Sequence, residues 1–421
     1  MSSIDKILTR WVSLLLIFVF LTACTSTSTG TLTTVTLSGW QSSPTEKQLL
    51  ERVLKNFEAT HPTIKVKFEV ITDQYMDVIR TRLIGDAAPD VFYLDALEAP
   101  LLMSNGVLEP LEKYITTDFD LDDFEPALLA AFKYQGTLYG LPKDFSTLAL
   151  FYNKKLFKEA SLTTPPQTWD ELRNYAKKLT VDKNRDGRYE QYGFGLTPEL
   201  ARQYFTIKAF GGRLVDENGY ATFATSNSIQ ALQLIINQYR SDRSAAIPSD
   251  LGASSTSEMF GQGKAAMVLE GSWTIPYLKE TFPEIEFGTA EVPAIGGKPG
   301  TMAYTVAYVM NKQSKHKDAA WELISYLTGV EGMKVWSKGG LVLPSRKSVL
   351  SEMGYEQNPL YEPFIKGVPY ATFWQVGETL PTIMTHFNNQ FLSALLGEQS
   401  LRIAMLKAQI AANKEIQASH Y

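Results

Sequence analysis

Few residues of this sequence have the types and spacing that catalysis requires. The four histidines are scattered along the chain, and neither an H-E-x-x-H metal motif nor a G-x-S-x-G nucleophile motif occurs. The stretch Gly261–Ala265 resembles a phosphate-binding loop, but its spacing is wrong and Ala265 lacks the hydroxyl of a Walker motif. We interpret this stretch as a turn that enters a strand. The sequence therefore favours binding over catalysis, and no catalytic residue is assigned.

One acidic loop carries the spacing of a metal site. Asp182, Asn184 and Asp186 offer side-chain oxygens at alternate positions, and the sixth residue is a glycine, as in loops that wrap calcium. The carbonyl of Arg188 and the carboxylate of Glu190 would complete the set, because the twelfth residue is a glycine rather than an acid. Two interpretations remain open, a structural calcium site and a solvated turn stabilised by its own Asx side chains. No other cofactor is expected.

The first residues predict export and lipid attachment. A short basic region precedes the apolar residues 11–21, a run of only eleven residues. A bilayer span needs roughly 20 residues. Residues 21–24 (Leu-Thr-Ala-Cys) fit a bacterial lipobox, and Cys24 is the only cysteine. We interpret residues 1–23 as a lipoprotein signal peptide and Cys24 as the lipidated residue, with a plain secretory signal as the alternative. Residues 24–34 are then a flexible tether.

The composition narrows the partners. The formal net charge is −5, and the sequence has no cluster of basic residues that would bind nucleic acid. A single cysteine allows no disulfide within the chain, and a chain of 421 residues can bury enough apolar surface to fold without one. Lipid on Cys24 would hold the protein outside the cytoplasm on a bacterial membrane, on the periplasmic side or at the cell surface.

The N-terminal half alternates strand and helix patterns. Apolar residues recur with the period of a strand or of a helix in turn, in the ranges Val35–Leu37, Ser43–Phe57, Ile64–Val70, Tyr75–Ile84 and Val91–Leu94. This βαβ order predicts a mostly parallel sheet covered by helices. Ligands of such sheets gather at the carboxyl ends of the strands, so Trp40 and Asp95 should face one crevice.

Two further helices are predicted outside this region. Thr168–Leu179 starts with a T-x-x-E capping box, and Lys317–Leu327 places apolar residues on one face. Because Trp169, Trp321 and Trp336 lie on predicted helices, we assign them to the hydrophobic core.

Five motifs spread over most of the chain resemble one known family. They are Ser38–Trp40, Ala88–Asp95, Leu138–Lys154, Pro166–Leu172 and Glu270–Trp273. Their order and spacing are similar to those of the extracellular solute-binding proteins of sugar ABC importers, the group that contains the maltose- and trehalose-binding proteins.

The resemblance implies an α/β, two-lobed periplasmic-binding-protein fold. Each lobe would hold a mostly parallel sheet flanked by helices, and crossing hinge strands would join the lobes. The N-terminal lobe is expected to comprise residues 35–143 with 302–345. The C-terminal lobe is expected to comprise residues 146–298 with 350–421.

The resemblance also implies a set of ligand-binding residues in the cleft between the lobes. They are Trp40, Glu46, Asp95, Asp144, Glu199, Tyr204, Trp273, Tyr304 and Trp374. Aromatic rings can cover the apolar faces of a pyranose, and carboxylates can accept hydrogen bonds from its hydroxyls. The roles of three of these residues stay open. Glu46 could contact the ligand or only cap a helix, and Asp144 could contact the ligand or act as a hinge residue. Tyr304 stands where the family usually has a small residue, and its ring could narrow the pocket.

The function implied is that of a monomeric ABC importer lipoprotein without enzymatic activity. It would capture a sugar of one to several rings, with a disaccharide of the maltose or trehalose class favoured, and deliver it to a membrane permease powered by a separate ATPase. Two alternatives remain: a surface glycosidase that uses paired carboxylates such as Asp95 and Asp144, and the same scaffold binding a non-sugar solute.

Overall fold

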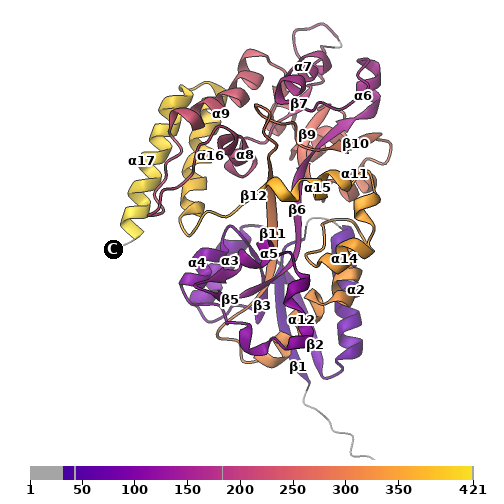
Figure 1. Ribbon diagram of the computed structural model, residues 1–421, viewed down its shortest axis with the longest axis vertical. Coiled ribbons are helices and arrows are strands. Elements are labelled where there is room, and N and C mark those ends of the chain that lie inside the picture. Colours follow the sequence, from indigo (N-terminus) through magenta and orange to yellow (C-terminus); the bar gives the residue numbers. More distant parts are fainter. Residues whose placement is uncertain (1–31, 42–43, 183, 420–421) are drawn as a thin grey trace, which may run out of the picture.

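Two lobes lie one above the other along the long axis of the molecule, and long strands run from one lobe into the other (Figure 1). The computed structural model describes residues 32–41, 44–182 and 184–419. The predicted signal peptide and Cys24 lie outside the described residues. The first strand begins at Thr33, inside the segment predicted to be the tether.

The N-terminal lobe is built on the predicted βαβ unit. Strand β1 (Thr33–Gly39) pairs in parallel with β2 (Ile64–Val70) on one side and with β3 (Val91–Asp95) on the other. Helices α2 (Pro44–Thr60) and α3 (Tyr75–Ile84) connect these strands. The other elements of this lobe are α4 (Ala99–Ser104), α5 (Pro126–Ala130), β4 (Lys133–Tyr134), β5 (Thr137–Leu138), α12 (Lys317–Thr328), α13 (Val330–Ser337) and α14 (Lys347–Glu352).

The C-terminal lobe is richer in helices. Its parallel strands are β7 (Phe194–Gly195), β8 (Ala245–Ala246) and β9 (Met267–Gly271). Its other elements include α6 (Lys154–Glu159), α7 (Trp169–Leu179), α8 (Leu200–Ala209), α9 (Ser226–Ile236), α10 (Thr256–Gly261), α11 (Thr274–Thr281), β10 (Phe287–Ala290), α15 (Glu362–Lys366), α16 (Leu380–Leu396) and α17 (Leu401–Ser419). The stretch Gly261–Ala265 contains the predicted turn, at Gln262 and Gly263, between the end of α10 at Gly261 and the start of β9 at Met267.

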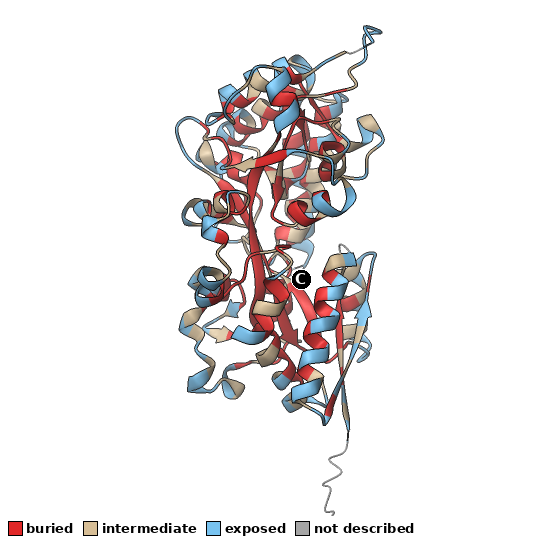
Figure 2. Ribbon diagram, turned by 90° about the vertical axis from the view of Figure 1, so that its right-hand side faces the viewer, coloured by how far each residue is buried: buried red, intermediate tan, exposed pale blue. Residues whose placement is uncertain are grey.

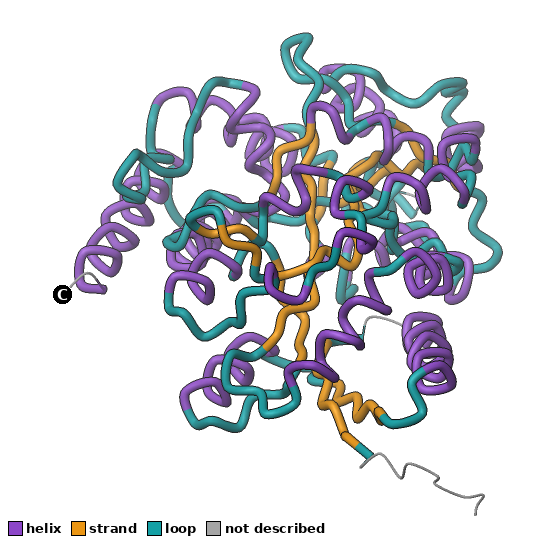
Figure 3. The backbone as a smooth tube through the Cα atoms, turned by 60° about the horizontal axis from the view of Figure 1, so that its bottom comes forward, coloured by secondary structure: helices purple, strands orange, loops and turns teal. Residues whose placement is uncertain are grey.

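Two long strands connect the lobes. Strand β6 (Gly140–Asn153) and strand β11 (Thr301–Met310) are antiparallel neighbours, and both are buried along almost all their length (Figure 2). In the N-terminal lobe β11 pairs with β3, and in the C-terminal lobe β6 pairs with β9 and β10. The short strand β12 (Ala371–Phe373) joins the far end of β11. The strands thus form a central layer with helices around it (Figure 3).

Local sequence signals explain several helix positions. Thr168 accepts a hydrogen bond from the Glu171 N–H while the Glu171 carboxylate accepts from the Thr168 N–H, so the predicted capping box starts α7. Leu50, Val53 and Phe57 of α2 are buried, as the predicted apolar face requires. Each lobe then has its own core, one around Phe57 and Tyr93 and the other around residues such as Trp169 and Phe387.

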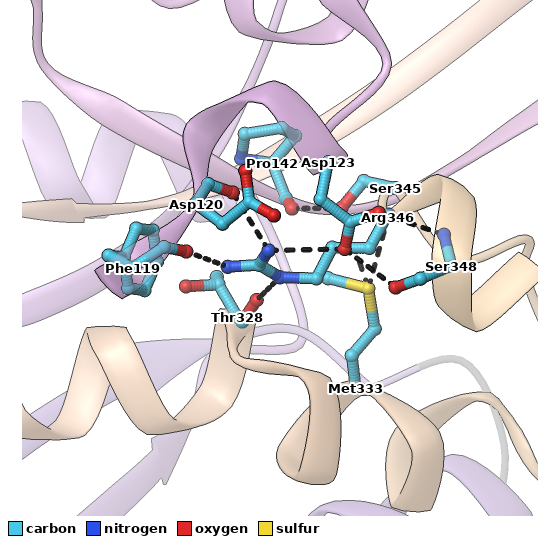
Figure 4. A network of polar contacts seen from close by, with 9 residues as sticks. All are labelled: Phe119, Asp120, Asp123, Pro142, Thr328, Met333, Ser345, Arg346 and Ser348. Carbon is cyan, nitrogen blue, oxygen red and sulfur yellow. Dashed lines mark hydrogen bonds and ion pairs between the residues drawn. The ribbon is translucent and has the colours of Figure 1, made fainter. Parts of the chain in front are cut away.

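A buried arginine fastens the segment after α13 to the N-terminal lobe (Figure 4). Arg346 donates from Nε to the Thr328 carbonyl (2.7 Å) and from Nη2 to the Phe119 carbonyl (2.9 Å). Its Nη1 donates to the Asp120 carbonyl (3.0 Å) and to the Asp123 carboxylate (3.2 Å). A buried charge is tolerated when its donors are paired in this way. The network therefore holds in place the loop whose residues 341 and 342 line the interlobe cleft.

Candidate functional site

A cleft of about 420 Å³ lies where the two crossing strands pass between the lobes. Its floor comes from β6 and β11, and its walls come from both lobes. It is lined by Trp40, Glu46, Asp95, Leu97, Lys143, Asp144, Phe145, Ser146, Glu199, Ala201, Arg202, Trp273, Tyr304, Thr305, Val306, Trp336, Leu341, Val342 and Trp374.

All the predicted ligand residues except Tyr204 line this cleft. Tyr204 lies on α8 and packs edge-on against Trp374, with ring centroids 6.3 Å apart, so it supports that ring from outside the cleft. Trp374 follows β12, and its backbone N–H donates to the Ala303 carbonyl of β11 (2.9 Å). It is only 4% exposed, so most of its surface already packs in the C-terminal core.

The N-terminal wall holds Trp40 and Asp95 at the carboxyl ends of β1 and β3, as the strand order predicted. The Trp40 ring meets the rings of Tyr75 (5.0 Å) and Tyr93 (5.3 Å) nearly at right angles, which fixes its orientation. Asp95 Oδ1 accepts a hydrogen bond from the Leu97 N–H (2.8 Å). Burial outweighs this bond and raises the pKa of Asp95 to about 6.

A bulge in β6 explains why neighbouring residues of this strand both line the cleft. Val306 of β11 pairs with Asp144, and Ala307 pairs with Pro142, so Lys143 is an extra residue between them. A bulge interrupts the alternation of side chains and turns one of them toward the other face. Lys143 and Asp144 are thereby buried side by side, 4% and 3% exposed, and form an ion pair.

Trp336 completes this charged group. Its Nε1–H donates to Asp144 Oδ2 (3.0 Å), and its ring lies under the Lys143 ammonium, 4.2 Å from Nζ. The Tyr93 ring lies on another side of the same ammonium (4.9 Å). Because Asp144 belongs to a strand that crosses between the lobes, the hinge role and the ligand role left open for it are compatible.

The C-terminal wall contains an arginine between two aromatic rings. The Arg202 guanidinium lies 5.5 Å from the Trp273 ring and 5.6 Å from the Tyr304 ring. Its Nη2 donates to Glu270 (3.1 Å), whose other oxygen accepts from the Thr256 hydroxyl. Burial opposes the charge, but the neighbouring Glu270 carboxylate raises the pKa of Arg202.

Eleven of the nineteen lining residues were not predicted from the sequence, and three of these bring a charge or an indole ring to the cleft: Lys143, Arg202 and Trp336. Lys143 and Arg202 lie within segments already singled out, beside Asp144 and between Glu199 and Tyr204. Trp336 was assigned to the core because it lies on a helix. It is indeed buried (4% exposed), but one side of it also lines the cleft, which helical periodicity alone does not reveal.

The other two tryptophans assigned to the core lie away from the cleft. Trp169 is 5% exposed and packs near Phe194 and Phe205. Trp321 is half-buried against the rings of Tyr114 and Phe119.

The charge of the cleft is predominantly acidic. Glu46, Asp95, Asp144 and Glu199 face only Lys143 and Arg202, and the charge of Arg202 is already offset by Glu270 behind it. Such a lining repels anions and suits a neutral or cationic solute.

The acidic loop at Asp182 has features of both interpretations left open. Carboxylate oxygens of Asp182, Asp186 and Glu190 lie within 4.8 Å of one another, a spacing that fits calcium coordination. Asp182 and Asn184 also accept backbone N–H groups of the loop, including Gly187 N–H to Asp182 Oδ2 (2.9 Å). The loop lies in the C-terminal lobe and shares no residue with the cleft lining.

Comparison with known proteins assigns the family. The sequence pattern of the bacterial extracellular solute-binding proteins matches residues 41–334, well over half of the chain. The chain belongs to this family. The resemblance found in the sequence is therefore confirmed, and with it the expectation that the protein belongs to a family of extracytoplasmic binding proteins rather than enzymes.

Individual solute-binding proteins support this assignment. The mannitol-binding protein of Pseudomonas aeruginosa is 27% identical over 403 residues, which cover 88% of this chain and 91% of that protein. An ABC substrate-binding protein of Listeria monocytogenes in complex with cycloalternan has a TM-score of 0.84 and 25% identity, covering 91% of this chain and 99% of that one. A solute-binding protein of Thermotoga lettingae with bound α-D-tagatose has a TM-score of 0.81 at 25% identity, with the same coverage. The predicted two-lobed fold is thus confirmed.

Within the part of the chain that the structure describes, no helix is both long and apolar enough to cross a bilayer.

Proposed function

We propose that this solute-binding protein captures a short, neutral saccharide between its lobes and delivers it to the permease of an ABC importer. A disaccharide of the maltose or trehalose class is the favoured ligand. The chain carries no ATPase motif, so a separate subunit would power transport.

The observation that carries this proposal is the pairing of rings and carboxylates from opposite lobes in one cleft. Trp40 and Asp95 come from the N-terminal lobe, while Trp273, Trp374 and Glu199 come from the C-terminal lobe. Aromatic rings cover the C–H faces of a pyranose, and carboxylates accept hydrogen bonds from its hydroxyls. A sugar bound here would touch both lobes at once.

Charge and size narrow the solute. The acidic lining disfavours sugar phosphates and uronic acids, because the carboxylates of the partly buried cleft would repel a negatively charged ligand. The cleft volume of about 420 Å³ lies toward the lower end of the roughly 300–1,000 Å³ common for small-molecule sites, which favours a short saccharide. The relatives described above bind mannitol, cycloalternan and tagatose, which supports a carbohydrate ligand.

Closure of the lobes provides the mechanism of capture. A ligand that contacts both walls binds the closed form more tightly than the open form, and only this difference in affinity shifts the population. The paired strands β6 and β11 form the floor and allow the lobes to rotate about them. The permease would then recognise the closed form.

Attachment to the membrane is the second part of the proposal. The lipobox places a diacylated cysteine at Cys24, and the tether after it would keep the lobes close to the permease. Labelling with a radioactive fatty acid in a bacterial host should mark the wild-type protein, whereas Cys24→Ser should stay unlabelled. Equal labelling of both proteins would refute lipidation at this residue.

A calorimetric screen tests the ligand class. The mature protein without its lipid is titrated with mono-, di- and trisaccharides, and with a sugar phosphate and a polyamine as controls. The proposal predicts binding of one neutral saccharide per chain and no binding of the phosphorylated analogue. Tight binding of the polyamine with no response to any saccharide would show that this scaffold carries a non-sugar solute.

A further inference from the structure

We propose that Tyr304 sets the upper length of the saccharide that the cleft accepts, an inference that rests on the proposed sugar-binding function. Tyr304 is the fourth residue of β11, where this strand lies between the lobes. Ala303 beside it pairs with Phe373 of the C-terminal lobe, and Val306 pairs with Asp95 of the N-terminal lobe. The side chain therefore rises from the floor of the cleft where the strand passes from one lobe to the other.

The Tyr304 side chain is held at both ends. Its backbone is fixed by pairing with Ser146 on β6, and its hydroxyl donates to the Ala201 carbonyl on α8 (2.6 Å). Burial raises the pKa of Tyr304, so the hydroxyl keeps its proton and remains a donor. Rotating the ring away would leave this hydroxyl without its partner in a buried environment, which disfavours any other rotamer.

Neighbouring side chains fix the faces of the ring. Trp273 meets it edge-on, with ring centroids 6.1 Å apart and planes at 66°. The Arg202 guanidinium lies against it at 5.6 Å and is itself held by Glu270 (3.1 Å). Trp273, Arg202 and Tyr304 thus form a supported wall. Because the ring spans from β11 to the Ala201 carbonyl of α8 and is supported by Trp273 and Arg202, a longer ligand could extend past it only by displacing it.

Two variants separate a length limit from an ordinary contact. Tyr304→Ala removes the ring and opens the space toward α8, whereas Tyr304→Phe keeps the ring and removes only the hydroxyl. Both are titrated calorimetrically with linear glucose, mannose and galactose oligosaccharides of one to four units. Thermal melting verifies that each variant is folded, and Tyr304→Leu, of intermediate volume, serves if Tyr304→Ala is not.

The wild-type protein should lose about tenfold or more in affinity when one unit is added beyond its best ligand, a discrimination that a shaped pocket can supply. Tyr304→Ala should reduce this loss to about threefold or less, and Tyr304→Phe should keep it. An unchanged length profile in a folded Tyr304→Ala protein, with affinity lowered equally for all lengths, would overturn the length limit while leaving sugar binding intact. If the wild-type protein binds none of the saccharides, the proposed function fails first and the inference falls with it.

Discussion

Removing the Asp144 carboxylate should destabilise the protein far more than removing an exposed acid. In Asp144→Ala the Lys143 ammonium stays buried, 4% exposed, without its ion-pair partner. Breaking a buried pair by deleting one side typically costs about 3–5 kcal/mol. The rings of Trp336 (4.2 Å) and Tyr93 (4.9 Å) still face the ammonium and retain part of its stabilisation. We therefore expect a loss of about 2–4 kcal/mol in the free energy of unfolding.

Urea denaturation of matched variants measures this loss. Glu362→Ala is the control, because Glu362 pairs with Lys366 (2.7 Å) on the surface, where the side chains are 43% and 56% exposed. Such an exposed pair contributes little to stability, because water and salt screen its charges. The double variant Lys143→Met with Asp144→Leu removes both charges and should recover most of the stability that Asp144→Ala loses. If Asp144→Ala shifts the unfolding midpoint no more than Glu362→Ala does, the assignment of a buried ion pair at the hinge is wrong.

Three further predictions concern the cleft and the acidic loop. Trp374→Ala should lower both sugar affinity and stability, because the ring lines the cleft yet is 4% exposed and packs in the C-terminal core, where truncating a large side chain costs about 3–5 kcal/mol. Trp321→Ala should lower stability alone, and unchanged sugar affinity in a folded Trp374→Ala protein would remove that ring from the site. Burial raises the pKa of Asp95 to about 6, and its proposed role as a hydrogen-bond acceptor requires the ionised form. The affinity for sugar should therefore rise as the pH increases through 6 and fall about tenfold for each pH unit below it. The sugar affinity of Asp95→Asn should not change with pH over this range. The same raised pKa means that the Asp95 contribution to stability is fully present below about pH 4 and is lost as the pH rises through 6, which chemical denaturation across this range measures. If the Asp182 loop binds calcium, the ion at a hundredfold excess over its dissociation constant should stabilise the wild-type protein by about 2.7 kcal/mol and so raise its melting temperature, but should leave Asp186→Ala unchanged. A melting curve that is indifferent to calcium and to chelator would instead establish the plain turn.

The fold could be predicted where the signals are local. The periodic patterns of Ile64–Val70 and Tyr75–Ile84 match β2 and α3, because alternation and helical spacing depend only on nearby residues. Trp40 and Asp95 were correctly expected to share one crevice, since the carboxyl ends of parallel strands meet at the same edge of a sheet.

The rest of the site depends on contacts between distant parts of the chain. Lys143 lines the cleft because of a bulge opposite Val306 and Ala307, which no local pattern in β6 announces. Arg202 is held in the cleft wall by its contacts with Glu270 and Tyr304, which lie on other elements of the fold. Trp336 has the periodicity of a core residue and lines the cleft because its indole reaches Asp144 of β6 (3.0 Å). Tertiary packing therefore decides these roles.

The most direct test of binding without catalysis combines solution scattering with chemical analysis of the recovered sugar. The mature protein should become more compact on addition of its best-binding saccharide, as expected when the lobes close, and should return that saccharide intact after long incubation. Hydrolysis needs an acid and a second carboxylate placed across the scissile bond, and here the Asp144 carboxylate is already occupied by Lys143 and Trp336. Conversion of the saccharide by catalytic amounts of protein, abolished by Asp95→Asn or Asp144→Asn, would instead establish a glycosidase and contradict the account of an importer subunit.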